Sequence, residues 1–309
     1  MKKLIVIAVA ALLISACGNK EEYLRERAAE LCKYIPDHEL LEQSKDFMTA
    51  DFYAVLDTMF NHLPEHEAMD HEWLYYFVTG NGGSIADYEV TGIEQTDKTH
   101  AVATIKVRQK WEDGSFDESS DVEEHKLYME KVNGQWLMSD FDGHKQDCIR
   151  HIEINRKEQA VRNAMCNYLT KNIAPHYLQG QLCIPTLMIV AEEEGSNETR
   201  VWCDCWIDWY NVAGDTLKTV SGGNHSGCMI VRQNNGKPVV TAFEQTEDGA
   251  GNEASAKHIF GKHYEVYHNM HSNQEVREAV RKEQLQEYVH SHNLKIRYYQ
   301  DYGWQAVEL

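Results

Sequence analysis

The sequence predicts an α+β protein made of two tandem domains, and three observations support this fold class. The chain of 309 residues is long enough for two domains. Each half shows helix-type hydrophobic periodicity first and strand-type alternation afterwards. Each half also carries a hairpin signal, Asn133-Gly134 in the first and Asn234-Asn235-Gly236 in the second. Helices followed by an antiparallel meander, twice, indicate two α+β units of related design.

The first predicted domain covers residues 23–150. An amphipathic helix is expected over 23–35, with an apolar stripe formed by Leu24, Ala28, Leu31 and Ile35. A second helix should follow Thr49, a residue type that favours the position before a helix, and a third is expected over 73–78. Four strands are then expected, at 84–95, 100–111, 122–132 and 135–141.

The second predicted domain covers residues 151–309. A helix over 156–173 precedes five expected strands, at 182–191, 200–212, 216–221, 228–233 and 237–245. The glycine-rich segment 221–228 is expected to shape a hairpin between two of them. A helical extension is expected from about residue 253, and the capping-box pair Ser272 and Glu275 should open its last helix. An aromatic tail should dock back on the core, with Tyr298, Tyr299, Tyr302 and Trp304.

This order of elements, with its two Asn-Gly hairpins, resembles the NTF2-like (cystatin-like α+β roll) superfamily. The resemblance covers both halves, residues 23–150 and 156–245. It implies two tandem NTF2-like domains in which a curved sheet wraps a long helix, followed by the C-terminal helical extension. It also implies a ligand or active site at the open end of a cone. The family includes enzymes, ligand carriers and assembly modules, so the resemblance alone selects none of these functions.

Residues 1–16 have the zones of a secretory signal peptide: two lysines, a short apolar run and small residues. The order Leu13-Ile14-Ser15-Ala16-Cys17 resembles the lipobox of bacterial lipoproteins. This resemblance implies cleavage before Cys17 and lipidation of Cys17, which would anchor the chain in a membrane through the short tether 17–22. The alternative is an ordinary signal peptide in which Cys17 is incidental.

Two further features address the location of such a lipoprotein. Gly18 stands where an inner-membrane retention signal would have aspartate, and Lys20-Glu21-Glu22 resembles the surface-export signal of Bacteroidetes lipoproteins. We therefore expect an envelope protein that is lipid-anchored in the outer membrane, with display at the cell surface as a further expectation. The 30 basic and 49 acidic residues give a net charge of −19, which repels phosphate backbones and argues against nucleic acid as a partner.

The cysteines and histidines suggest no metal or other cofactor. Seven cysteines remain besides Cys17, an odd number that leaves at least one thiol unpaired if disulfides form. Cys203 and Cys205 could share a strand face and bind a metal together with Cys228 or a histidine. Structural zinc sites have paired Cys or His spacings that this chain lacks, which favours buried thiols or one disulfide.

The segment from Val201 to Tyr210 is the most informative part of the sequence. Alternation predicts a core face formed by Val201, Cys203, Cys205, Ile207 and Trp209. The opposite face carries the binding candidates, Trp202, Asp204, Trp206, Asp208 and Tyr210, to which His225 is added. Aromatic rings interleaved with carboxylates suit glycan recognition. The alternative is that the tryptophans pack beneath the C-terminal helices while the aspartates face solvent.

The leading functional expectation is a membrane-tethered ligand-binding or protein-interaction module with a glycan, peptide or envelope-protein partner and no catalysis. The first alternative is a hydrolase-type enzyme with a cone pocket in the second domain, using Asp204 or Asp208 with His225 as acid–base groups. The two aspartates lie about 13 Å apart along one strand, too far to act as a glycosidase pair by themselves. The second alternative is a structural component of an envelope assembly, which would expose an apolar patch.

Overall fold

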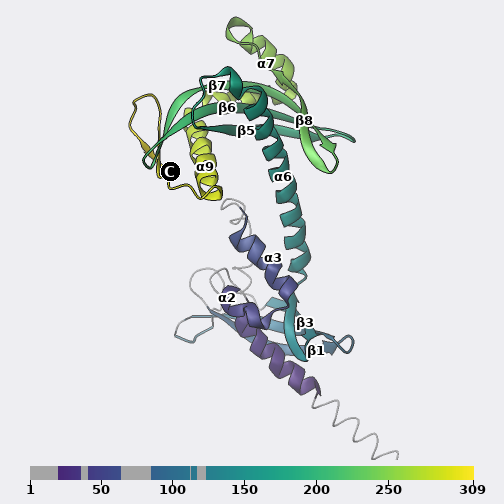
Figure 1. Ribbon diagram of the computed structural model, residues 1–309. Coiled ribbons are helices and arrows are strands. Elements are labelled where there is room, and N and C mark those ends of the chain that lie inside the picture. Colours follow the sequence, from purple (N-terminus) through teal and green to yellow (C-terminus); the bar gives the residue numbers. More distant parts are fainter. Residues whose placement is uncertain (1–19, 36–40, 64–84, 112, 117–122) are drawn as a thin grey trace, which may run out of the picture. The chain divides into compact units, whose positions relative to one another are not determined.

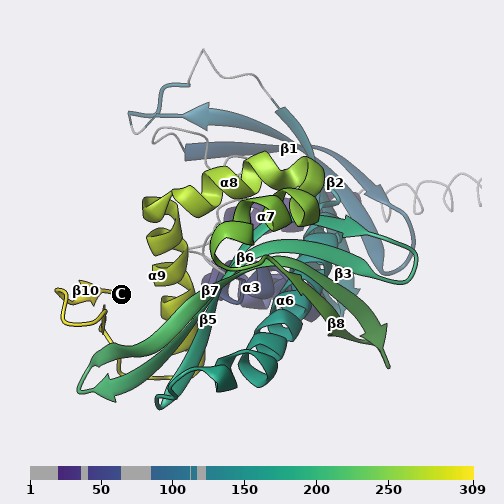
Figure 2. The same cartoon turned by 90° about the horizontal axis from the view of Figure 1, so that it is seen from above.

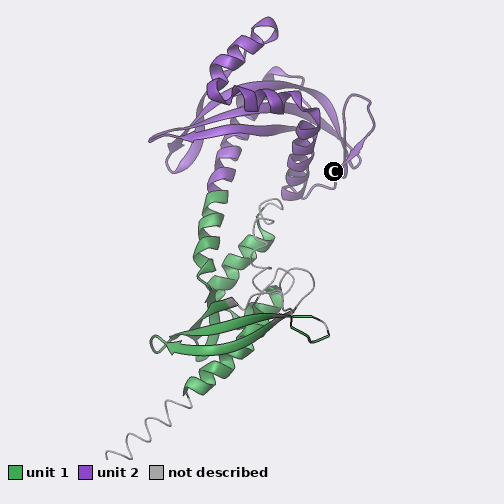
Figure 3. Cartoon of the chain, turned by 180° about the vertical axis from the view of Figure 1, so that it is seen from behind, with its two compact units in different colours: residues 1–155 green, residues 156–309 purple. Residues whose placement is uncertain are grey.

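Curved antiparallel sheets packed against helices make up both halves of the chain, which is an α+β protein (Figure 1). The computed structural model describes residues 20–35, 41–63, 85–111, 113–116 and 123–309. The signal segment, Cys17 and the expected helix 73–78 lie outside these residues. The chain divides into two compact units, residues 1–155 and 156–309 (Figure 3). Among the helices in the described ranges, none is both long and apolar enough to span a membrane.

Unit 1 contains an antiparallel sheet in the order β1-β2-β3-β4. Its strands are β1 (Ile85–Gln95), β2 (His100–Lys110), β3 (Glu123–Val132) and β4 (Gln135–Phe141), each within one residue of the predicted bounds at either end. Asn133 and Gly134 both have positive φ and form the tight turn between β3 and β4. The predicted hairpin is therefore confirmed, because Asn and Gly tolerate the left-handed backbone that such a turn requires.

The helices of unit 1 bury one stripe each against this sheet. A helix over 20–31 continues into η1 (Cys32–Tyr34), and all four residues of its predicted apolar stripe are buried in one core with the sheet. The short helices α2 (Leu41–Ser44) and η2 (Lys45–Phe47) lead into α3 (Ala50–Asn61). Thr49 does precede α3, but its side chain makes no capping hydrogen bond. Its backbone N–H instead donates to Met138 of β4, so Thr49 joins the helix to the sheet.

Helix α6 (His144–Asn172) starts twelve residues before the predicted start at 156, so that start was wrong. The reason is that Cys148 and Ile152 extend the apolar pattern and are buried in the core of unit 1. The boundary between the two units, after Asn155, thus falls inside a helix and not in a linker. The short helix η4 (Ala174–His176) follows α6.

The sheet of unit 2 has the order β10-β9-β7-β6-β5, with β8 also paired to β7. Its long strands are β5 (Leu182–Glu194), β6 (Thr199–Ala213), β7 (Thr216–Asn234) and β8 (Lys237–Gln245). Two short strands, β9 (Tyr298–Gln300) and β10 (Val307–Glu308), come from the C-terminal tail. The turn between β7 and β8 is made by Asn235 and Gly236, both with positive φ, as predicted.

The predicted hairpin within 221–228 was wrong, because β7 runs without interruption through this segment. Its glycines do not form a turn. They allow groups of the neighbouring strands to come close to the β7 backbone. A Cβ on Gly222 would lie 2.3 Å from Asp208 Oδ1, and one on Gly227 would lie 2.0 Å from the Glu244 carbonyl oxygen. Side chains at these positions would collide with polar groups of neighbouring strands, so glycine is required within the strand.

Helices cover both faces of this sheet (Figure 2). Helix α6 packs on the face that carries Cys203, Cys205 and Ile207. The C-terminal helices pack on the opposite face: α7 (Asn252–Phe260), α8 (Tyr264–Ser272) and α9 (Gln274–Ser291), with the short turns η5 (Gly249–Gly251) and η6 (Gly261–His263). Strand β6 is therefore buried on both sides.

Two predictions about the C-terminal region need correction. The residue that caps α9 is Asn273, whose side chain accepts from the Val276 N–H, while the Ser272 hydroxyl donates back into α8. The aromatic tail docks only in part: Tyr299 is buried, but Tyr302 is 67% and Trp304 76% exposed. Tyr299 is buried because β9 adds to the edge of β7, whereas the residues after it pass beyond the sheet.

Candidate functional site

The Trp- and Asp-containing face of β6 is covered by the C-terminal helices and is not an open platform. Trp202 is buried against Phe260, and its indole N–H donates to the Ile259 carbonyl at 2.8 Å. Tyr210 is also fully buried, and its hydroxyl accepts from Arg281 of α9. Trp202 therefore packs beneath the C-terminal helices, as the alternative interpretation expected. The same interpretation expected the aspartates to face solvent, and this was wrong. Asp204 is only 1% and Asp208 only 8% exposed.

Asp204 is saturated by hydrogen bonds. Its Oδ1 accepts from Asn224 and from the Ser226 hydroxyl (2.7 Å), and its Oδ2 lies 3.0 Å from His271 Nδ1 of α8. Burial alone would raise the pKa of Asp204, but the bonds from His271, Asn224 and Ser226 outweigh it and lower the pKa. The same bond to Asp204 raises the pKa of His271. Asp204 therefore fixes α8 to the sheet and has little capacity left for a ligand.

Arg281 of α9 is the centre of a second buried polar group. Its guanidinium donates to both carboxylate oxygens of Asp301, at 2.6 and 2.8 Å, and to the Tyr210 hydroxyl at 2.9 Å. A further bond reaches the Thr219 hydroxyl at 3.2 Å. Burial by itself would raise the pKa of Asp301, but the pairing with Arg281 and Thr219 lowers it. This bidentate guanidinium–carboxylate pair, with its bonds to Tyr210 and Thr219, joins α9 to the sheet and to the C-terminal tail.

Asp208 differs from both of these aspartates because no described residue donates a hydrogen bond to it. Its nearest cation is Arg281, whose Nε lies 3.7 Å from Oδ2. Burial raises the pKa of Asp208 to about 6, against the lowering effect of Arg281. A carboxyl group that is buried without a hydrogen-bond donor is costly for a fold and is a common mark of a functional site.

A cavity of about 200 Å³ lies beside Asp208. Trp206, Arg277 and Gly222 also line it, together with Asp301 and other groups from α9 and the C-terminal tail. The Arg277 guanidinium lies over the Trp206 ring at 4.6 Å. The Trp206 indole N–H is buried and has no acceptor among the described residues. Two residues with unsatisfied hydrogen-bonding groups, Asp208 and Trp206, therefore line one small polar cavity.

The sixth candidate residue, His225, lies on the opposite face of the sheet. Its neighbours Asn224 and Ser226 both contact Asp204, so His225 points away from that carboxylate. Its ring bonds to the Tyr177 hydroxyl at 2.8 Å and to Gln245 at 2.9 Å. The sheet thus separates His225 from Asp204 and Asp208, and the acid–base pairing considered from the sequence is not formed. The reason is the continuity of β7, whose alternation sends residue 225 to the α6 side.

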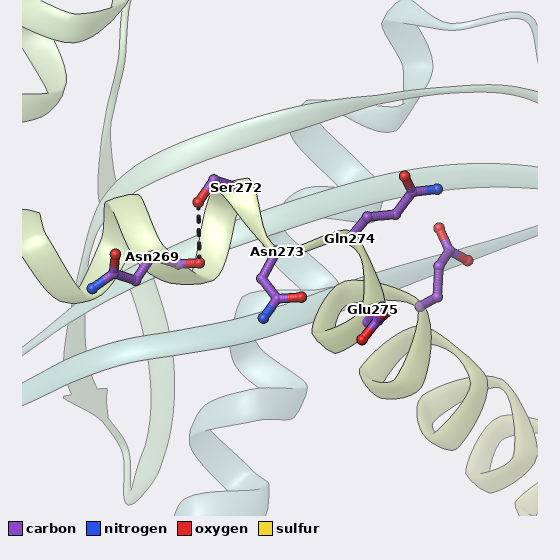
Figure 4. A pocket seen from close by; sticks show the side chains of 6 residues that line it. Asn269, Ser272, Asn273, Gln274 and Glu275 are labelled. Carbon is purple, nitrogen blue, oxygen red and sulfur yellow. Dashed lines mark hydrogen bonds between the residues drawn. The ribbon is translucent and has the colours of Figure 1, made fainter.

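A larger hollow, of about 870 Å³, opens at the junction of α8 and α9. Figure 4 shows Asn269 and Ser272 on the last turn of α8 and Glu275 on the first turn of α9, around Asn273. These side chains are all exposed, and Asn273 is used to cap α9. We regard the smaller cavity as the candidate site because only there are charged groups buried.

The cysteines form no disulfide with one another within the described part of the chain. Cys203 and Cys205 are buried in the core beneath α6, while Cys228 packs with Trp202 on the other face. The sheet therefore separates the thiols that could have shared a metal. In the residues that the structure describes, no cluster of His, Cys, Asp or Glu could hold a metal ion.

The most important residues that the sequence interpretation missed are Arg281, Asp301 and His271. One signal was available for the first, because Arg281 lies four residues before Leu285 on the same stripe of the predicted helix. A charged residue on an apolar stripe indicates a buried partner. No local pattern pointed to Asp301 or His271, which reach the site only through the packing of the C-terminal region.

Comparisons with known proteins assign no family to this chain. No family model matches, and no curated protein matches. A solved structure described as "Ntf2 like protein involved in plasmid conjugation" aligns over 75% of this chain and 98% of its own, with 10% identity and a TM-score of 0.18. A superposition that poor carries no argument about fold or function.

Proposed function

We propose that this protein is a membrane-tethered envelope lipoprotein whose second unit binds a polar, cationic group of its ligand in the cavity beside Asp208. The observation that carries the proposal is the state of Asp208, a buried carboxyl group that lines a cavity and receives no hydrogen bond from any described residue. An amine or guanidinium of a ligand would pair with it and remove the cost of its burial.

The charged neighbours of Asp208 favour a cation in this position. Arg281 is already committed to Asp301 and Tyr210, and Arg277 lies over the Trp206 ring. The donors of Arg281 are therefore largely used, and Arg277 makes no hydrogen bond to Asp208 among the described residues. Asp301 and Glu278 add negative charge to the same cavity. A ligand that brings positive charge fits this balance better than an anion does.

A peptide is a better candidate than a glycan for the same reason. Sugar recognition needs an open aromatic face, but Trp202 is buried and one face of Trp206 is occupied by Arg277. Recognition at this site would depend on charge and hydrogen bonds, and only secondarily on ring stacking. We therefore favour a peptide carrying lysine, arginine or a free amino group, with a glycan as the competing outcome of the test.

The anchor and the fold family belong to this proposal as well. Cys17 would carry the lipid, and the two α+β units would be tandem NTF2-like domains in the envelope. The lipid anchor is tested by growing cells with a labelled fatty acid: the chain should take up label, and Cys17→Ser should abolish uptake. Uptake by Cys17→Ser at the level of the native chain would refute the anchor.

A second candidate function, acid–base catalysis, is favoured by one observation, the pKa of Asp208 near 6. Two of its possible partner groups are not available, since His225 is on the other face and Asp301 is paired with Arg281. Hydrolysis of any bound peptide or glycan that is lost in Asp208→Asn would favour this candidate over simple binding.

The binding proposal is tested on the purified full-length chain by titration while tryptophan fluorescence is recorded. We expect short peptides with lysine or arginine to change the fluorescence, because Trp206 lines the cavity. Asp208→Asn should weaken binding by at least tenfold. The matched control is Asp215→Asn, on the exposed turn between β6 and β7, which should leave affinity unchanged. Equal affinity in Asp208→Asn and the native chain would refute the site, and a response to neutral sugars alone would refute its cationic ligand.

A further inference from the structure

We infer that the ligand is an extended peptide that adds as a strand to the open edge of β7 and directs a lysine or arginine side chain to Asp208. This inference rests on the function proposed above and specifies the form of the ligand. Its basis is an interruption in the sheet of unit 2.

The outer edge of β7 is paired at both ends but not in the middle. Strand β9 pairs in parallel with Thr216–Lys218, and β8 pairs antiparallel with Gly227–Asn234. Among the described residues, Thr219 and residues 221–225 pair only with β6, on the inner edge, and Val220 lies at a register shift. The open edge is roughly 23 Å long at about 3.3 Å per residue. Figure 2 shows β8 and the tail with β10 at opposite ends of this unit.

The backbone groups of every second residue along this interruption face outward. The Thr246 N–H donates to the Ser226 carbonyl at 2.9 Å, so Ser226 presents its backbone to the outer edge. The register with β6 has no shift between Ser221 and Ser226. Alternation therefore also turns the N–H and C=O of Gly222 and Asn224 outward. On that edge, no described residue bonds to the backbone of either one. An incoming strand would find a ready row of donors and acceptors.

Two adjacent glycines of this edge line the cavity beside Asp208. Gly222 faces Asp208 and Gly223 faces Tyr177 on the other side of the sheet, yet both line the same cavity. The backbone of both glycines therefore borders the cavity. Glycine within a strand is typical of places where another backbone approaches closely.

The same geometry selects the side chain that enters the cavity. In an antiparallel or parallel pair, residues opposite each other project to the same face of the sheet. The direction that a Cβ of Gly222 would take leads to Asp208 Oδ1. A peptide residue opposite Gly222 would therefore direct its side chain toward the Asp208 carboxylate, which occupies the space over Gly222. Lysine and arginine have the length and charge for this contact.

The test uses the purified full-length chain and acetylated, amidated heptapeptides of alternating threonine and valine with a central lysine. Affinity is measured by calorimetry. Replacing lysine by norleucine should weaken binding at least tenfold in the native chain and in Asp215→Asn, but not in Asp208→Asn. N-methylation of each peptide bond in turn should weaken binding at alternate positions only, because every second N–H would face β7. Hydrogen exchange should slow at Gly222 and Asn224 when the peptide is bound.

The possible results separate this inference from the function on which it depends. If Nα-acetyl-lysine methylamide binds as tightly as the peptide, or N-methylation has no alternating effect, the strand addition is refuted and the cationic cavity stands. If norleucine and lysine peptides bind equally, the contact with Asp208 is refuted. If neither the lysine peptides nor the lysine derivative binds, the inference and the proposed function are both refuted.

Discussion

Replacement of Arg281 by methionine should strongly destabilise unit 2 at neutral pH. Methionine keeps much of the length of the side chain and removes its charge, so packing changes less than electrostatics. The native guanidinium makes bonds to Asp301, Tyr210 and Thr219 and lies 3.7 Å from Asp208. The variant leaves the buried Asp208 carboxylate and the partly exposed Asp301 carboxylate without their cation.

The magnitude follows from the loss of one partner of a buried ion pair, which typically costs about 3–5 kcal/mol. We expect a decrease of this size in the free energy of unfolding at pH 7. The deficit should shrink as the pH falls, because an unpaired buried carboxylate has a raised pKa and becomes neutral on mild acidification. Asp301→Asn in the Arg281→Met background should recover part of the loss by removing one of the two charges.

The assay is urea unfolding from pH 4.5 to 8, with hydrogen exchange of the β6 amides to report on unit 2 by itself. Arg297→Met is the matched control, because that guanidinium is exposed and lies 3.7 Å from an exposed Glu308 carboxylate. Exposed pairs of this kind contribute about 0–1 kcal/mol. The reasoning is wrong if Arg281→Met costs no more than Arg297→Met, or if its deficit is the same at pH 4.5 and pH 8.

Three further predictions concern neighbouring residues. Asp208→Asn should raise the free energy of unfolding by about 1–3 kcal/mol above pH 6, because it removes a buried charge whose pKa is raised from 3.8 to about 6; the gain should disappear as the pH falls toward 4. Hydrogen exchange in α8, corrected for its intrinsic rate, should accelerate above neutral pH. The reason is that the bond to Asp204 raises the pKa of His271, so this stabilisation is complete below about pH 6.5 and is lost as His271 deprotonates. Gly223→Ala should cost about 1–3 kcal/mol in thermal unfolding, because a Cβ there would lie 2.1 Å from the Tyr177 hydroxyl oxygen.

Each of these predictions has a clear contrary result. A loss of stability in Asp208→Asn at pH 8 would mean that the carboxylate is well satisfied in the fold. A rate of exchange in α8 that does not change with pH, or changes equally in His271→Asn, would remove the role of that histidine. If Tyr177→Phe fails to restore any stability to Gly223→Ala, the collision with the hydroxyl is not the cause of the loss.

Elements of unit 1 were predictable because each depends on a short-range pattern. The apolar stripe of the first helix and the Asn133-Gly134 turn need only local periodicity and backbone preference. The four strands follow from alternation between turn residues. The start of α6 was missed because its two ends contribute apolar residues to two different cores. The apolar pattern of the second core begins only after the helix has already started.

The prediction for β7 failed because glycine has two opposite uses. In isolation, Ser221-Gly222-Gly223 is typical of a turn. Within the sheet, the missing side chains of Gly222 and Gly223 make room for Asp208 and Tyr177, which are distant in sequence. Only the positions of Asp208 and Tyr177 show that these glycines lie within a strand and do not form a turn.

Residues 202, 204, 206, 208 and 210 could be placed on one face of a strand from the sequence alone, because side chains alternate with period two. The sequence also determined the α+β class and both Asn-Gly turns. What each residue on that face can do depends on the neighbours that packing brings to it. Asp204 is saturated by His271, Tyr210 is bonded to Arg281, and Asp208 lines a cavity without a donor. The physical reason is that hydrogen-bond satisfaction depends on partners from α8, α9 and the tail, which are brought to β6 by packing and leave no mark in the local pattern of β6.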